Sequence, residues 1–491
     1  MGSNLQLAEP AYCNNPSPSY DVVCNIMNQW LSQSSQKNLV GKTKNVIEET
    51  AKNSVRIMYK NVFVDPDQFI LEFLQNAEDA RFELCNNKQE LCNENGLFRI
   101  RIFKDKIIIE NNGKNLDRDD IISLCTVSPR KKPSIGYKGF IGIGWKSVFK
   151  ISHHIDIASK SLDGSYFVSF QFSKDAWNNP YLREIINKFN LKPDEVAWEL
   201  TPIPTSMPED LDKGWTRFTI FIEEETAKQL SKIVNEKLRG HMFLFLKYIN
   251  RIEIEDNIND VKKIIEWNHE KEPEKLNNIN IYKYKISEKA QPINSNNSNK
   301  LDETIGRYIM FSKEIDVPDY IKNDNETKNS NREDVEKREV SIAFELDTNK
   351  NEIRKFNSSQ LLGVYSFMPL DEVKSGLYFL IQADFIIQAG RKTINYNAKW
   401  NKWLMEEIAD LLNDSISYLK ENYTKSYPTI LDYDEDISQE MKLLLNDTVW
   451  KTIKEIYGPP SKLSVLDNYE IRDSFDEVFK PEDEFIYEKT N

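Results

Sequence analysis

The spacing of apolar and polar residues first marks out a helix over residues 69–84. Its apolar side chains recur at helical spacing, which predicts one buried face. Asp65 can cap the start of this helix, and Pro66 suits its first position. Glu72 and Asn76 stand four residues apart and share one face. A carboxylate and a carboxamide stacked in this way can line a pocket, although an ordinary amphipathic helix fits the pattern equally well.

Runs of alternating or continuous apolar residues predict a series of strands. Over the first 225 residues these strands alternate with helices, which indicates an α/β fold with a mixed sheet. Later strands predict a second, α+β region. The expected strands are 98–103, 106–110, 155–159, 166–172, 216–222, 251–255, 279–286, 307–311, 340–346, 364–368 and 377–381. The other expected helices are 22–31, 44–60, 119–125, 145–151, 224–249 and 400–418.

Two further stretches are rich in glycine and turn-forming residues. In Ile107–Leu116, an apolar strand ends at the cluster Asn111-Asn112-Gly113, which also fits a plain turn between strands. In Ile135–Phe149, glycines are interleaved with apolar residues, which argues against a simple linker. Backbone N–H groups at such glycines can approach phosphate oxygens, and a following helix presents its positive end to the same anion. The candidate phosphate-contacting residues of this stretch are Lys138, Gly139, Gly142, Gly144 and Lys146.

In their order and spacing, these three stretches resemble the Asn box and the two glycine boxes of the GHKL (Bergerat-fold) ATPases. The sequences LEFLQNAEDA (71–80) and GIGWKSVF (142–149) are most similar to the sacsin and NO VEIN branch, which is related to the ninety-kilodalton heat-shock chaperones. The resemblance is good over residues 40–225 and weaker to about 415. It implies an α/β sandwich (Bergerat) ATPase domain, an α+β middle domain, and ATP and Mg²⁺ as cofactors.

The resemblance also implies roles for single residues. Glu72 would polarise the attacking water, Asn76 would bind Mg²⁺, and Asp79 would line the nucleotide pocket. Most relatives carry an Asp where this chain has Asn111, two residues before Gly113, although the sacsin-like pattern often has an Asn there. That Asp accepts a hydrogen bond from the adenine amino group. An Asn can still accept but lacks the charge, which roughly doubles the strength of a hydrogen bond.

Two more positions match the family pattern in later parts of the chain. Thr216 matches a threonine whose hydroxyl lies near adenine, with one extra residue after Gly214. Arg391, in the run Gln388-Ala389-Gly390-Arg391, resembles the arginine that reaches the γ-phosphate when the two domains close. A planar guanidinium suits bidentate phosphate binding. A surface salt bridge is the alternative for Arg391.

Composition narrows the class of protein. The chain has 491 residues with 40% hydrophobic and 29% charged residues, as in a globular protein of two or three domains. Its net charge of −13 argues against a chain-wide nucleic-acid surface. The five scattered cysteines lack metal-binding spacing, and no apolar run approaches a membrane span. We therefore expect a cytoplasmic protein without membrane contact. No histidine precedes the Asn box, which argues against a sensor histidine kinase.

We expect four regions along the chain. These are an N-terminal arm and helix (1–40), the ATP-binding domain (41–225), a chaperone-like middle domain (226–420) and a helical C-terminal region (421–491). Asn-rich and charged segments at 288–302 and 322–338 predict disordered insertions in the middle domain.

The favoured function is a slow, Mg²⁺-dependent, chaperone-like ATPase. It would act on an unknown protein client or partner, and ATP would promote a transient homodimer. One alternative is an ATP-binding scaffold that does not hydrolyse, within a nucleic-acid maintenance or antiviral defence system. A second alternative is a MutL- or topoisomerase-like DNA clamp.

Overall fold

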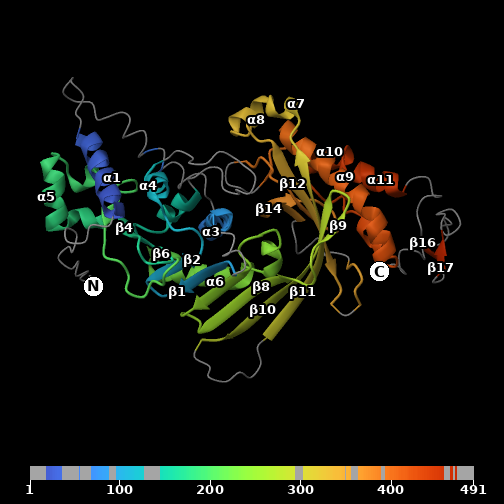
Figure 1. Ribbon diagram of the computed structural model, residues 1–491, viewed down its shortest axis with the longest axis horizontal. Helices are drawn as coiled ribbons and strands as arrows, with labels where there is room; N and C mark the ends of the chain where they lie inside the picture. The colour runs from blue at the N-terminus through green and yellow to red at the C-terminus, as the bar shows by residue number, and fades with distance from the viewer. Residues whose placement is uncertain are drawn as a thin grey trace.

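The computed structural model describes residues 18–35, 53, 55, 68–87, 95–126, 144–293, 302–348, 350–354, 363–388, 393–457, 465–467 and 470–472. In these residues, 15 strands form one mixed sheet that runs from one end of the molecule to the other (Figure 1). Its order is β14-β13-β15-β12-β11-β10-β8-β7-β1-β2-β6-β3-β4-β5, and β9 pairs with β10. We refer to β1–β8 and their helices as the first half, and to β9–β15 and theirs as the second half.

The strands of the first half are β1 (Leu97–Ile102), β2 (Lys106–Asn111), β3 (His154–Lys160), β4 (Phe167–Ser173), β5 (Ile203–Pro204), β6 (Trp215–Phe221), β7 (Arg251–Asp256) and β8 (Val261–His269). Those of the second half are β9 (Glu274–Leu276), β10 (Ile279–Pro292), β11 (Asp302–Asp316), β12 (Lys337–Leu346), β13 (Gly363–Ser366), β14 (Met368–Lys374) and β15 (Leu380–Gln382). A separate hairpin contains β16 (Val465–Asp467) and β17 (Glu470–Arg472).

Most neighbouring strands are antiparallel, and two pairs are parallel. β7 pairs with β1 in parallel, although strands β2–β6 lie between them in the sequence. β13 and β15 form the other parallel pair. β10 joins the halves because it pairs with β8 on one side and with β11 on the other. The expected mixed α/β architecture is therefore confirmed.

Helices cover the sheet at both ends (Figure 1). The first half carries α1 (Pro18–Ser35), α3 (Gln68–Asn87), α4 (Arg118–Leu124), α5 (Pro180–Lys188) and α6 (Glu224–Lys237), with the 3₁₀ helices η4 (Gly144–Lys150), η5 (Asp175–Asn178), η6 (Pro193–Glu195) and η7 (Gly240–Phe243). The second half carries α7 (Asp319–Lys322), α8 (Asn325–Asn329), α9 (Lys399–Asn422), η8 (Tyr427–Leu431), α10 (Gln439–Asn446) and α11 (Val449–Tyr457).

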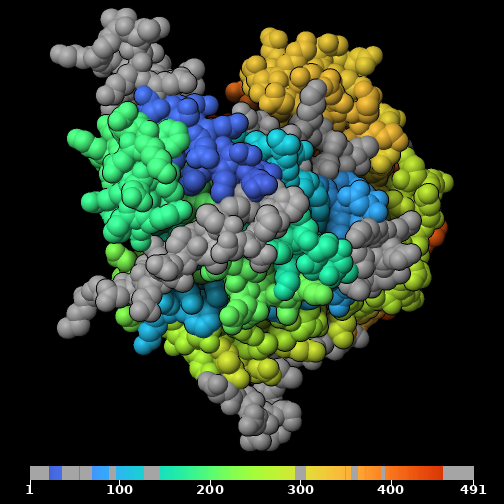
Figure 2. Space-filling model, turned by 60° about the vertical axis from the view of Figure 1, so that its left-hand side comes forward, coloured from blue at the N-terminus to red at the C-terminus, as the bar shows by residue number. Residues whose placement is uncertain are grey.

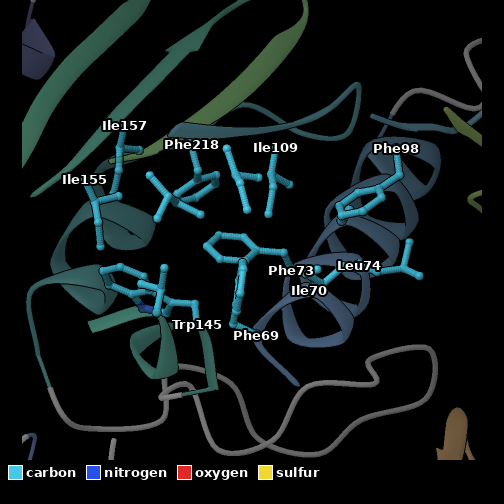
Figure 3. Packing of buried hydrophobic residues seen from close by; sticks show 14 of the residues in the cluster. Phe69, Ile70, Phe73, Leu74, Phe98, Ile109, Trp145, Ile155, Ile157 and Phe218 are labelled. Atoms are coloured by element: carbon cyan, nitrogen blue, oxygen red, sulfur yellow. The ribbon is translucent and has the colours of Figure 1, made fainter. Parts of the chain in front are cut away.

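Two hydrophobic cores follow from this arrangement. The first lies between the first-half strands and helices such as α3, and Figure 3 shows Phe69 and Phe73 of α3 facing the side chains of the sheet. The second lies between β11, β12 and α9. β10 serves both cores, because Ile281 belongs to the second and Ile286 to the first. The expected domain boundary at 225/226 remains a prediction; β7 and β8 lie after it and extend the first-half sheet.

The N-terminal helix α1 packs locally. It contacts β4, β5 and α4, and its Val23 and Leu31 are buried in the first core. Figure 2 shows α1, in blue, lying beside α5 and α4. In the part of the chain described, no helix has the length and apolar character needed to cross a membrane.

The expected helix over 224–249 is shorter in the structure. α6 ends at Lys237, and the chain then forms the short 3₁₀ helix η7. Gly240 at the start of η7 lies so close to β10 that a Cβ there would be 2.3 Å from Ile286 Cγ2. The close packing of the backbone at Gly240 against the sheet therefore explains why the α-helix does not continue, although the apolar residues keep a helical spacing.

The prediction of disorder for 322–338 is wrong. This segment contains α8 and the start of β12, and Arg332 within it is buried and bonded to Asp384. Arg332 Nη2 and Arg338 Nε donate to the two oxygens of Asp384 at 2.8 and 2.6 Å. Ion pairing with a buried carboxylate orders a segment whose composition is typical of a loop. Of the other predicted insertion, residues 288–292 belong to β10, and residues 294–301 lie outside the described part.

Candidate functional site

Helix α3 is the framework of the candidate site. Its apolar face is buried against the first-half sheet, and the rings of Phe73 and Phe218 lie 4.7 Å apart (Figure 3). Trp145 of η4 approaches the same cluster, with its ring 6.5 Å from that of Phe218. The aromatic cluster therefore fixes η4 against α3 and the sheet.

The polar residues of α3 differ in exposure. Glu72 is only 4% exposed and Asp79 is also buried, whereas Asn76 is exposed. Helical geometry places Glu72 and Asn76 on one face, one turn apart. The helix thus combines an enclosed carboxylate with an accessible carboxamide.

Glu72 lies directly against the start of η4. A Cβ on residue 144 would be only 1.7 Å from Glu72 Oε2 and 2.3 Å from its Cδ, so a side chain at this position would have to displace the carboxylate. The second glycine-rich stretch and the Asn-box helix therefore meet at Glu72 and Gly144. This contact brings together two motifs that are distant in the sequence.

The end of β2 meets the same helix about two turns beyond Glu72. Lys114 N donates to Ala80 O at 2.9 Å, and a Cβ on Gly113 would lie 2.7 Å from Ala80 Cβ. Asn111 is buried, and its Oδ1 accepts from Gly113 N at 3.1 Å. This bond holds the turn that packs against α3.

Thr216 lies next to Asn111 across the sheet. The two residues are register partners in the β2–β6 pair. The Thr216 hydroxyl lies 2.8 Å from Ser159 Oγ, which also accepts from Leu116 N at 3.1 Å. The structure therefore places Asn111 and Thr216 side by side, while Asp79 lies on α3 next to Ala80, which packs on Gly113; a base-binding role for these residues stays a prediction.

Lys146 points into the protein interior. The residue is 1% exposed, its Nζ donates to Leu124 O, and its ammonium lies 4.4 Å from the centre of the Trp145 ring. Burial lowers the pKa of Lys146 to about 7, against the opposing effects of nearby Cys125 and Glu199. Lys146 thus ties η4 to the end of α4, and its contact with phosphate stays a prediction.

Several predicted site residues lie outside the described residues. They are Lys138, Gly139, Gly142 and Arg391. The flanks of the Arg391 segment are described. Ile387 and Ile394 form an isolated bridge, and Gln388 N donates to Thr393 O at 2.9 Å. The buried side chain of Asn401 accepts from Ile386 N and donates to Ile386 O, both at 2.7 Å. Helix α9 therefore holds both flanks of this segment.

Sequence reasoning missed three buried carboxylates. Glu78 binds backbone amides of residues 247–249, Glu110 accepts from Arg217 Nε at 2.7 Å, and Asp384 binds two arginines. A charge within the apolar run Ile107-Ile108-Ile109-Glu110 was a usable signal, since an unpaired carboxylate is costly in a buried strand. In the described part of the chain, no three His, Cys, Asp or Glu side chains form a group that could hold a metal ion.

No protein-family model matches the chain. Protein NO VEIN of Arabidopsis thaliana is 24% identical over 383 residues, which cover 74% of this chain and 12% of the plant protein. The Endoplasmin homolog of Hordeum vulgare is 24% identical over 192 residues, 34% of this chain and 23% of that protein. The chain thus spans under a quarter of either plant relative. The uncharacterized protein R10 of Acanthamoeba polyphaga mimivirus is 23% identical over 295 residues, which cover 57% of this chain and 72% of the viral protein. These similarities give modest support to a distant relationship with NO VEIN and with the Hsp90-like chaperones.

Proposed function

We propose that this chain binds ATP with Mg²⁺ and hydrolyses it slowly, as a chaperone-like conformational machine with a Bergerat ATPase domain in its first half. The observation that carries the proposal is the contact between Glu72 and Gly144. It joins the Asn-box helix to the second glycine box at the one residue that the reaction needs as a base. Similarity to the Endoplasmin homolog supports the same reading.

Glu72 is the proposed catalytic carboxylate. It would orient and polarise the water that attacks the γ-phosphate, a role typically worth ~10²–10⁴-fold in rate. Its burial on α3 against the Gly144 backbone supports this role, because a fixed carboxylate in a water-poor site needs little reorganisation. The exposed Asn76 lies one turn away on the same helix.

Asn76 is the proposed protein ligand of Mg²⁺. In nucleotide sites this ion keeps several waters and takes one or two protein oxygens besides the phosphates, so a single exposed carboxamide fits it without an acidic cluster. Bound there, Mg²⁺ would neutralise charge on the phosphates.

Adenine is the proposed occupant of the region around Asp79, Asn111 and Thr216. Register pairing of Asn111 with Thr216, and the packing of Gly113 on α3, support this assignment. Gly139, Gly142 and Lys138 are proposed to contact phosphate, and Arg391 to reach it from the second half. These four proposals rest on the family resemblance.

The test is Mg²⁺-dependent ATP turnover and nucleotide binding by the wild type and Glu72→Ala. Glu184→Ala, on the exposed face of α5, is the matched control. We expect Glu72→Ala to bind nucleotide but to lose turnover by ~10²-fold or more, with the control unchanged. Failure of the wild type to bind ATP would refute the proposal.

A scaffold that binds ATP without turnover is the second candidate. Asn111 Oδ1 already accepts from Gly113 N, and an amide oxygen is a weaker acceptor than a carboxylate, so we expect weak ATP binding under either candidate. Binding without turnover by wild type and Glu72→Ala alike would select this candidate. ATP-dependent dimerisation is tested separately by light scattering with a non-hydrolysable analogue, where an unchanged monomer mass would count against it.

A further inference from the structure

Glu78 lies on α3 two residues beyond Asn76, but its side chain leaves the candidate site. It is 0% exposed. Its carboxylate accepts from three consecutive backbone N–H groups. Lys247 N lies 2.7 Å from Oε1, Ile249 N lies 2.7 Å from Oε2, and Tyr248 N lies 3.2 and 3.1 Å from the two oxygens. Hydrogen bonds to an ionised acceptor are about twice as strong as neutral ones.

The three amides belong to a segment that we call the connector, residues 244–250. It follows η7 and leads directly into β7. On the first-half side, the Tyr248 ring lies 5.2 Å from that of Phe82 on α3. Close packing also leaves no room for a side chain at residue 96, where a Cβ would be 1.8 Å from Tyr248 O.

The connector also contacts the second half. The ring of Phe245 packs edge-on against Tyr365 of β13 at 4.9 Å. Lys247 Nζ forms an ion pair with Glu339 of β12. One short segment thus contacts the helix of the candidate site and two strands of the second half.

We propose that Glu78 is a positioning residue that couples α3 to the second half through the connector. If α3 moves, the backbone amides of residues 247–249 must move with it to keep their hydrogen bonds to Glu78. Losing these bonds is costly, because the carboxylate is buried and cannot replace the amides with water. Conversely, a movement of Phe245 against Tyr365 would be transmitted through the connector and Glu78 to α3, which carries Glu72 and Asn76. Coupling to nucleotide turnover rests on the proposed function, whereas the mechanical coupling does not.

The first test is a double-mutant cycle without nucleotide. Phe245→Leu loosens the contact with Tyr365, and hydrogen exchange reports protection of the α3 amides. We expect Phe245→Leu to speed α3 exchange by about tenfold in the wild type and to add little in Glu78→Gln, since residues joined in one network are non-additive. Glu83→Gln, on the same helix but bonded to Lys114, is the control background and should leave the effect of Phe245→Leu intact. Additive effects in the Glu78→Gln background would overturn the proposal.

The second test separates positioning from a merely structural role. In folded Glu78→Gln we expect nucleotide affinity within about threefold of wild type and turnover lowered by about tenfold, a loss confined to kcat. Equal losses in the Glu83→Gln control would overturn that assignment. If Glu78→Gln does not fold, Glu78→Asp, which retracts the carboxylate by one methylene, replaces it in both tests. A wild type that binds no nucleotide refutes the proposed function and leaves the exchange cycle to decide the coupling.

Discussion

The carboxylate of Glu72 and the backbone of Gly144 lie in contact, with no room for a methyl group between them. The two residues come from separate elements, α3 and η4, whose relative position is fixed by the aromatic packing of Phe73, Trp145 and Phe218. A side chain at residue 144 would have to displace the carboxylate or the 3₁₀ helix.

Gly144→Ala is therefore expected to abolish turnover while the fold survives. A misplacement of about 1 Å at a catalytic group can cost 10²-fold in rate. Turnover and circular dichroism of the variant measure the two effects. Gly306→Ala serves as the control, because its nearest neighbour is the edge of the Tyr308 ring at 3.0 Å. Full activity of Gly144→Ala would remove Glu72 from the proposed role.

Asn111→Asp is expected to strengthen ATP binding by up to about tenfold, because a carboxylate is a stronger acceptor for the adenine amino group. The turn should persist, since an Asp oxygen can accept from Gly113 N as Asn111 does. Titration with ATP and GTP measures the effect. A gain for GTP equal to that for ATP would show that residue 111 does not contact adenine.

The pH dependence of stability should report the burial of Lys146. Its pKa is lowered from 10.5 to about 7 in the folded chain. Between these values the unfolded chain binds the proton and the folded chain does not, so the contribution of Lys146 to stability rises with pH. The stability advantage of Lys146→Met over wild type should therefore shrink from pH 7 to pH 10 in urea unfolding. An exposed control, Lys188→Met, should show a constant difference, and a constant difference for Lys146→Met would contradict the assignment.

Asp384→Asn is expected to destabilise the second half by about 3–5 kcal/mol, the usual cost of breaking a buried ion pair. Arg332 and Arg338 share this carboxylate, and the Asp384 side chain is 1% exposed. Chemical unfolding measures the loss. Asp319→Asn, whose side chain is 95% exposed, should change stability by less than about 0.5 kcal/mol. Similar losses in the two variants would contradict a special role for the cluster.

Much of this fold could be predicted because periodicity is a local property. The apolar stripe of α3 and most strands of the sheet lie where the spacing of residues indicates. Spacing places Glu72 beside the apolar stripe of α3, but its burial is seen only in its contact with residue 144. What local patterns cannot give is the partner of a side chain across the fold. From the sequence alone, Glu78 would be taken for an acidic residue that faces solvent. The backbone N–H groups of residues 247–249 that donate to it can be identified only once β7 is placed beside β1.

Because local patterns do not show the partners of a side chain, they also do not predict the contacts of Lys146 or the order of the segment before β12. A lysine within a glycine box is predicted to contact phosphate, and no local pattern shows that its ammonium lies against Leu124 O and the Trp145 ring. The composition of the charged segment 322–338 predicts disorder, yet Arg332 and Arg338 within it form ion pairs with the buried Asp384. In both cases a distant group decides the outcome.

The parallel pairing of β7 with β1 has a practical consequence for anyone dividing this chain into fragments. A fragment ending at residue 225 would lack β7 and expose the edge of β1, a strand whose Phe98, Ile100 and Ile102 are buried. Unpaired strand edges of this kind template aggregation. A fragment ending after β8 would keep that pair but expose the edge that β10 occupies. A cut after β10 would in turn expose the edge that β11 occupies, so a fragment without a new sheet edge extends through β15.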